Sequence, residues 1–182
     1  MLKIVKDTQK SLREKCVEVE MPLSEADKKT LDEMLQYLKD SQNEEFREKH
    51  KEVREGVGLA APQIGINKRM LVVYYEGGKE GEYVTHQLVN PKIVVNSVKQ
   101  CYLSNGEGCL SVDKDHPGHV YRSFRIDVKA YDAFVGKDVR ITARGFDAIV
   151  LQHEIDHLSG ILYYDHIDPK DPMKVIPGSV EI

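Results

Sequence analysis

The sequence has few cysteines, no long hydrophobic run and no excess of positive charge, and each absence argues against a class of protein. Its three cysteines, Cys16, Cys101 and Cys109, are too few for the disulfide framework of a small secreted domain. The longest apolar stretch, residues 70–75, is far shorter than the roughly 20 residues that span a bilayer. We therefore expect neither a disulfide scaffold nor a membrane protein.

The charge balance disfavours nucleic acid and membrane surfaces as partners. The chain carries 26 Lys and Arg against 30 Asp and Glu, a formal net charge of −4 at pH 7. The basic residues are scattered, so no site for a phosphate backbone is evident. The first ten residues resemble neither an export signal nor a transit peptide, which favours a cytoplasmic location.

What is present is the composition of an ordinary soluble globular protein. Hydrophobic residues make up 41% of the 182 and charged residues 31%, unlike the composition of disordered chains. A chain of this length can bury a core without disulfide or metal staples. At roughly 150 residues per domain, we expect residues 1–182 to form a single domain.

One amphipathic helix is predicted in the first quarter of the chain. Ser24 suits the N-cap position and Asp27 the capping-box position. The apolar residues that follow share one helical face: Leu31, Met34, Leu35 and Leu38. Residues 39–55 are strongly charged and nearly lack this periodicity, so we interpret them as a solvated extension or loop rather than a binding surface.

The middle of the chain is typical of β-structure. Residues 70–75 indicate a buried strand, and residues 76–79 indicate the turn of a hairpin. Residues 88–95 predict either two short strands or one strand with a break at Asn90-Pro91. Each interpretation places extended chain before the last third of the sequence.

The last third predicts a strand pair and then a buried helix. Residues 126–130 and 139–143 alternate between apolar and polar side chains, as two half-buried strands that pair would. Residues 146–158 are apolar nearly all round, typical of a helix in the middle of a domain, and Gly160 suits its end. This order favours an α+β fold, with mainly antiparallel sheets packed around that central helix.

The strongest chemical signal lies on this predicted helix, in the sequence His153-Glu154-Ile155-Asp156-His157. Side chains four residues apart lie on one face of a helix, so the two imidazoles can share one metal ion. Glu154 can then reach a metal-bound water without being a ligand. The alternative is two buried histidines that merely hydrogen-bond in a core, and the apolar helix with its well-placed glutamate disfavours it.

A catalytic metal site needs a third protein ligand and a free position. The place of a third histidine in the metzincin pattern holds Tyr163, and the only glutamate downstream, Glu181, has no helix to hold it. Upstream, Cys109 in the segment 107–111 can supply a thiolate, a good ligand for a divalent transition metal. Taken alone, such a cysteine is more often a small buried hydrophobe.

Three segments, in order, resemble the three signature motifs of the peptide deformylase family. They are GVGLAAPQ at residues 56–63, EGCLS at 107–111 and QHEIDH at 152–157. The charged segment before Gly56 and the sequence GEGCLSV resemble the Gram-positive-type branch of the family. The resemblance implies a single catalytic domain over residues 1–182. It also implies a metal-dependent hydrolase that removes the formyl group from the N-terminal formyl-methionine of new polypeptides and releases formate.

The resemblance also implies roles for individual residues. The metal ligands are Cys109, His153 and His157, holding one divalent ion, which is Fe(II) in the cell and Zn, Ni or Co in many purified members. Glu154 takes a proton from water and delivers it to the leaving amine. The side-chain amide of Gln63 and the backbone N–H of Leu110 stabilise the tetrahedral oxyanion.

On the substrate side, the resemblance implies an extended peptide beside backbone groups at Val57, Gly58 and Gly108. The methionine side chain needs an apolar pocket, for which residues one and two turns before His153 are candidates: Phe146, Ile149 and Val150. Ordinary core packing remains an alternative role for them. The expected partners are the formyl-methionyl N-termini of nascent polypeptides; transient contact with the ribosome is left open, and no nucleic-acid site or membrane is expected.

One buried ion pair is predicted as well. Arg122 stands where the family keeps an arginine after the cysteine motif, and Asp156 lies on the buried helix. Because an unpaired buried carboxylate is costly, we expect Arg122 to pair with Asp156.

Two other functions compete with the hydrolase. An HExxH zinc endopeptidase would need a third ligand that the sequence does not supply. A structural metal module for protein binding would leave Glu154 and Gln63 without a role, and such sites usually close all four positions with protein ligands.

Overall fold

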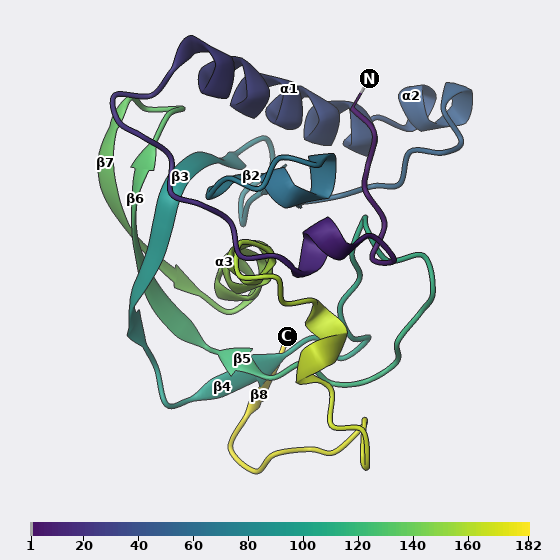
Figure 1. Ribbon diagram of the computed structural model, residues 1–182. Coiled ribbons are helices and arrows are strands. Elements are labelled where there is room, and N and C mark those ends of the chain that lie inside the picture. Colours follow the sequence, from purple (N-terminus) through teal and green to yellow (C-terminus); the bar gives the residue numbers. More distant parts are fainter. Residues whose placement is uncertain (1) are drawn as a thin grey trace.

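The computed structural model describes residues 2–182, which form two β-sheets around a central helix (Figure 1). The larger sheet is antiparallel and has the order β1 (Gly58–Ala60), β2 (Met70–Glu76), β3 (Tyr83–Asn96), β6 (Arg125–Asp132), β7 (Lys137–Arg144). The smaller sheet has the order β5 (Arg122–Ser123), β4 (Gln100–Tyr102), β8 (Val180–Glu181). The helices are α1 (Glu25–Gln42), α2 (Glu44–Lys49) and α3 (Phe146–His157), with short 3-10 turns at Lys10–Arg13, Ala61–Ile64 and Tyr163–His166.

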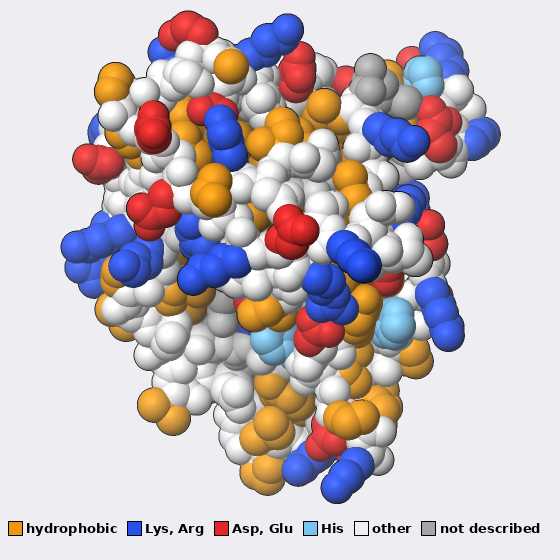
Figure 2. All heavy atoms as spheres, viewed as in Figure 1, with side chains coloured by type: hydrophobic (Ala, Val, Ile, Leu, Met, Phe, Trp, Pro, Cys, Tyr) orange, Lys and Arg blue, Asp and Glu red, His pale blue; other side chains and the backbone are white. Residues whose placement is uncertain are grey.

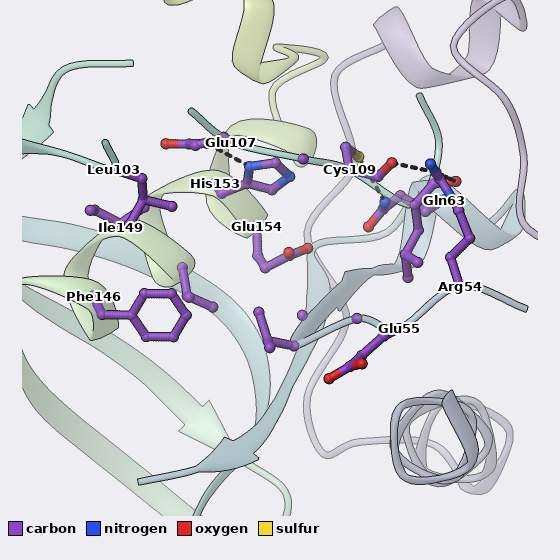
Figure 3. A pocket seen from close by; sticks show the side chains of 16 residues that line it. Arg54, Glu55, Gln63, Leu103, Glu107, Cys109, Phe146, Ile149, His153 and Glu154 are labelled. Carbon is purple, nitrogen blue, oxygen red and sulfur yellow. Dashed lines mark hydrogen bonds and ion pairs between the residues drawn. The ribbon is translucent and has the colours of Figure 1, made fainter. Parts of the chain in front are cut away.

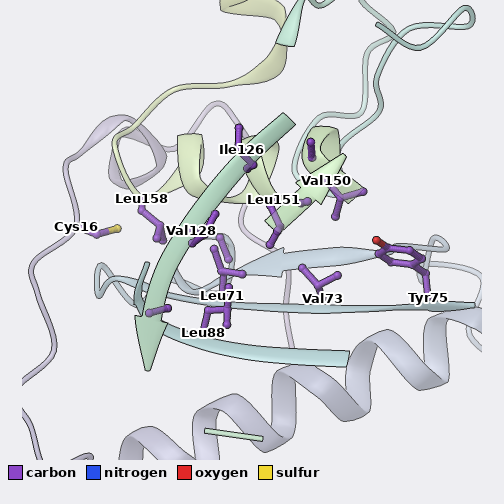
Figure 4. Close-up of a cluster of buried hydrophobic side chains, with 14 residues drawn as sticks. Cys16, Leu71, Val73, Tyr75, Leu88, Ile126, Val128, Val150, Leu151 and Leu158 are labelled. Carbon is purple, nitrogen blue, oxygen red and sulfur yellow. The ribbon is translucent and has the colours of Figure 1, made fainter. Parts of the chain in front are cut away.

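Helices α1 and α3 cover opposite faces of the larger sheet. Side chains alternate along a strand, so β2 turns Leu71 and Val73 toward α3 and Met70 and Val72 toward α1. This double coverage explains why β2 is a continuous apolar run rather than an alternating one. Figure 4 shows the cluster of buried apolar side chains between the larger sheet and α3, where Leu71 and Val73 lie beside Leu151 of α3.

The predicted first helix is confirmed with its cap. The Ser24 hydroxyl accepts a hydrogen bond from the Asp27 backbone N–H at 3.1 Å. The four predicted apolar residues of α1 are all buried in the core against the sheet: Leu31, Met34, Leu35 and Leu38. The interpretation of residues 39–55 as solvated is wrong at Val53, which is buried in the same cluster.

The predicted strands are also confirmed, including the break. Strands β6 and β7 pair antiparallel, with Val128 opposite Ile141. Strand β3 is one strand whose register shifts between Val89 and Lys92, beside Asn90 in a left-handed conformation (φ 51°). The short strand β8 pairs parallel with β4, in contrast to the antiparallel pairing between the other labelled strands of the described chain, and no sequence pattern predicts it.

Helix α3 lies between the two sheets, which places its His and Glu side chains inside the molecule (Figure 1). Gln152 fixes the helix to β5, because its side-chain amide donates to the Ser123 carbonyl at 2.9 Å and accepts from the Ser123 N–H at 3.0 Å. In the part of the chain described, no helix is long and apolar enough to cross a membrane.

Candidate metal centre

Three side chains of α3 form the floor of the site. His153 and His157, four residues apart, have ring centroids 5.0 Å apart, and Glu154 lies between them in sequence. All three are at most 9% exposed. The helical spacing therefore brings both imidazoles to one buried spot, as the sequence predicts.

Cys109 completes the cluster from a loop. Its Sγ lies 3.3 Å from Nε2 of His157, and one ligand atom from each of Cys109, His153 and His157 lies within 4.8 Å of the others. In Figure 3, Cys109 lies on the far side of His153 from Leu103 and Ile149. The structure thus brings together the three predicted ligand residues from segments more than 40 residues apart.

A network of charged side chains holds the His153 ring through its Nδ1 atom. Its Nδ1 lies 2.8 Å from Oε2 of Glu107, which accepts a bond from Arg122 at 2.9 Å. Arg122 also binds Asp156 at 2.9 Å, which confirms the predicted pair, and Asp156 lies 2.7 Å from Nε2 of His166. A carboxylate on the second nitrogen of a ligating histidine is the usual support of a metal site.

Burial and neighbouring charges set the protonation of these groups. Burial raises the pKa of Glu107, but hydrogen bonds from His153 and Arg122 outweigh it and lower the pKa to about 2. Burial lowers the pKa of His157 well below its usual value. Glu107 is therefore a permanent carboxylate, and His157 is held as the neutral imidazole that ligates metals.

Glu154 is a buried carboxyl beside the cluster. Burial raises its pKa to about 7, and its Oε2 has no hydrogen-bond partner among residues 2–182. Gly58 faces it so closely that a Cβ at that position would lie 2.3 Å from Oε1 of Glu154. The missing side chain at Gly58 therefore makes the space that the carboxylate occupies.

The residues present fit a divalent transition metal. One thiolate and two imidazoles suit Fe(II), Zn, Ni or Co. The cluster found within the described chain contains three ligand residues, as in catalytic sites, and not the four of a closed structural site. The unpartnered Oε2 of Glu154 beside this cluster indicates room for a water or substrate atom.

The two predicted oxyanion donors lie beside the thiolate. Nε2 of Gln63 is 3.4 Å from Sγ of Cys109 and 3.2 Å from Oγ of Ser111, while its Oε1 accepts from the Ala60 N–H at 2.8 Å. The Leu110 N–H donates to no acceptor in the described structure. The Leu110 N–H is therefore free to donate to a ligand at the metal, whereas Gln63 can do so by turning an N–H away from Cys109 or Ser111.

A pocket of about 300 Å³ opens over these groups. All six predicted substrate residues line it: Val57, Gly58, Gly108, Phe146, Ile149 and Val150. Of the predicted ligands, His157 lies beneath the lining. The sequence alone assigns no role to five further lining residues, Arg54, Glu55, Gly56, Leu103 and Glu107, although three of them stand in or next to a quoted motif.

Comparisons with known proteins agree on one family. A family model described as polypeptide deformylase matches residues 1–173. A peptide deformylase of Macrococcus caseolyticus is 51% identical over 100% of this chain and 98% of its own length, and peptide deformylase 2 of Bacillus subtilis is 48% identical over 100% and 97%. The crystal structure of a probable peptide deformylase from Synechococcus phage S-SSM7 is 38% identical, with a TM-score of 0.70 over 92% of this chain and 100% of that one.

Proposed function

The chain belongs to the peptide deformylase family of metal-dependent enzymes that remove the formyl group from N-terminal formyl-methionine, and we propose that Cys109, His153 and His157 hold its metal. One observation carries this assignment, namely the convergence of their ligand atoms within 4.8 Å beside a buried, unpartnered Glu154 oxygen. We propose residues 1–182 as one catalytic domain, because α3 packs on the larger sheet and also hydrogen-bonds to β5 of the smaller one through Gln152.

Iron(II) is the metal proposed for the cell, with zinc, nickel or cobalt as substitutes after purification. The thiolate and imidazole donors suit all four ions. When bound, a divalent ion supplies a Lewis acid that makes water nucleophilic near neutral pH.

Glu154 is the proposed proton carrier. Its free Oε2 can accept the proton of the attacking water, and the same carboxyl can then deliver that proton to the leaving amine. A pKa near 7 suits both steps, because the group must be deprotonated before attack and protonated afterwards.

The oxyanion that forms at the formyl carbon is proposed to accept hydrogen bonds from Nε2 of Gln63 and the N–H of Leu110. Ser111 and Ala60 fix the Gln63 amide from both ends, so the donor is oriented before substrate arrives. Loss of one such donor typically costs a factor of about 10² to 10³ in kcat.

The peptide is proposed to lie extended along Val57, Gly58 and Gly108, with its methionine side chain against Phe146, Ile149 and Val150. Ile149 and Val150 are buried, whereas Phe146 is 37% exposed and meets Tyr75 edge-on at 5.3 Å. This arrangement supports an apolar pocket with one side open to solvent. We further propose that the enzyme acts in the cytoplasm, on nascent chains that it meets transiently at the ribosome.

The test is release of formate from formyl-Met-Ala-Ser by protein purified anaerobically. We expect turnover with this substrate and none with formyl-Asp-Ala-Ser, because the proposed pocket is apolar. Cleavage of casein without formate release would contradict the assignment and favour an endopeptidase.

A further inference from the structure

Arg54 clamps the loop that carries Cys109. Its Nη2 donates to three backbone carbonyls, those of Cys109 at 2.6 Å, Leu110 at 2.8 Å and Val112 at 3.0 Å. The guanidinium thus lies where three carbonyl dipoles converge, and it arrives from a segment 55 residues away in sequence.

The remaining carbonyl of residues 109–112 is held as well. The Ser111 carbonyl accepts from the Asp7 N–H at 2.9 Å, and the Leu110 carbonyl also accepts from Lys6 at 3.2 Å. All four carbonyls therefore accept hydrogen bonds from other segments, and Arg54 donates to three of them.

The consequence for Leu110 follows from peptide geometry. The carbonyl of Cys109 and the N–H of Leu110 belong to one planar peptide unit, which is trans, since the cis bond of the described chain is Met21–Pro22. In a trans unit these two groups point in opposite directions. The Cys109 carbonyl also accepts from the Val112 N–H at 3.1 Å, a bond within the loop. The bond from Arg54, at 2.6 Å, ties this peptide unit to another segment and so helps to fix the direction of the Leu110 N–H.

We propose that Arg54 is a positioning residue that holds the Leu110 N–H in the orientation of an oxyanion donor. The inference rests on the proposed role of Leu110 in deformylation. Arg54 lines the pocket, but it acts through the peptide unit and not by touching the reacting atoms. The charged segment before Gly56 thereby gains a role beyond solvation.

The test compares Arg54→Ala with Lys51→Ala, both in metal-loaded enzyme. Lys51 is exposed in the same segment, so its removal deletes one positive charge without touching the loop. We expect Arg54→Ala to lower kcat about tenfold to a hundredfold with KM for formyl-Met-Ala-Ser and metal content unchanged, because an oxyanion donor acts only in the transition state. Lys51→Ala should match wild type.

A second readout does not depend on activity. Deuterium uptake by residues 106–112, followed by mass spectrometry, should be faster in Arg54→Ala than in wild type and unchanged in Lys51→Ala. An unchanged kcat in Arg54→Ala, or a rise in KM alone, would overturn the inference, as would loss of metal. Absence of formate release by wild type would overturn the proposed function instead.

Discussion

At the scale of single residues, the site depends on small distances around Glu154. A buried carboxyl with one free oxygen is costly, and this one exists because Gly58 leaves the space for it. The ligand residues could be predicted from sequence, since helical spacing and one cysteine motif specify them. Arg54 and Glu107 could not be assigned, because Arg54 binds carbonyls 55 or more residues away, Glu107 meets His153 46 residues away, and no spacing rule links them.

Gly58→Ala tests the fit of Glu154. The new Cβ would lie 2.3 Å from Oε1, so the carboxylate must move. We expect a loss in kcat of about tenfold or more, since misplacing a catalytic group by about 1 Å can cost 10²-fold. Metal content should not change. Gly78→Ala, at an open turn position, is the matched control for formate release.

At the scale of elements, strongly periodic segments were predictable and very short ones were not. Helix α1 and the pair β6–β7 follow long apolar repeats, and α3 is a long run that is apolar nearly all round. Strands β4, β5 and β8 have two or three residues each, and long-range pairing alone makes them strands. The site needs both kinds, because Arg122 of β5 and Gln152 of α3 join the smaller sheet to the helix.

Arg122→Met tests that junction. Arg122 is buried between Glu107 and Asp156, and its loss leaves two carboxylates without their cation. Breaking a buried pair in this way costs about 3–5 kcal/mol of unfolding free energy. Urea denaturation should show this loss, whereas Arg140→Met, at a half-exposed pair with Asp127, should cost less than about 1 kcal/mol. Equal effects would contradict the account.

The ion pair between α1 and the segment just before β2 makes the stability of the fold depend on pH. Burial raises the pKa of Asp27, but hydrogen bonds with Lys68 and Ser24 outweigh it and lower the pKa below its usual value. A carboxylate with a lowered pKa contributes stability above its unfolded value, about 3.9, and loses it as the pH falls through the folded value. Urea midpoints at pH 6 and pH 3 should therefore differ less in Asp27→Asn than in wild type.

At the scale of the whole molecule, the metal site brings together the Cys109 loop and helix α3, which no strand pairing connects. The Cys109 loop and α3 meet at the site, where the ligand atoms of Cys109, His153 and His157 lie together. Charged side chains of both signs are mixed over the face that Figure 2 shows, as expected for a net charge of −4. The fold class could be predicted because both helices carry clear apolar patterns, but the depth of the pocket depends on packing between distant segments.

Removal of the metal tests whether the site stabilises the whole fold. A ligand that binds only the folded state stabilises it by about 2.7 kcal/mol at 100 times its Kd. Chelation should therefore lower the Tm of wild type, and zinc added back should restore it. Cys109→Ala should show neither change, and an equal shift in that variant would contradict the ligand assignment.

The central claim is that Glu154 carries the proton and does not hold the metal. The most direct measurement is the metal content and the rate of formate release of Glu154→Gln beside wild type, both purified anaerobically. We expect a full complement of metal and a loss of almost all turnover, because the amide keeps the shape of the side chain but cannot accept the proton. Turnover equal to that of wild type, or loss of the metal, would contradict the account.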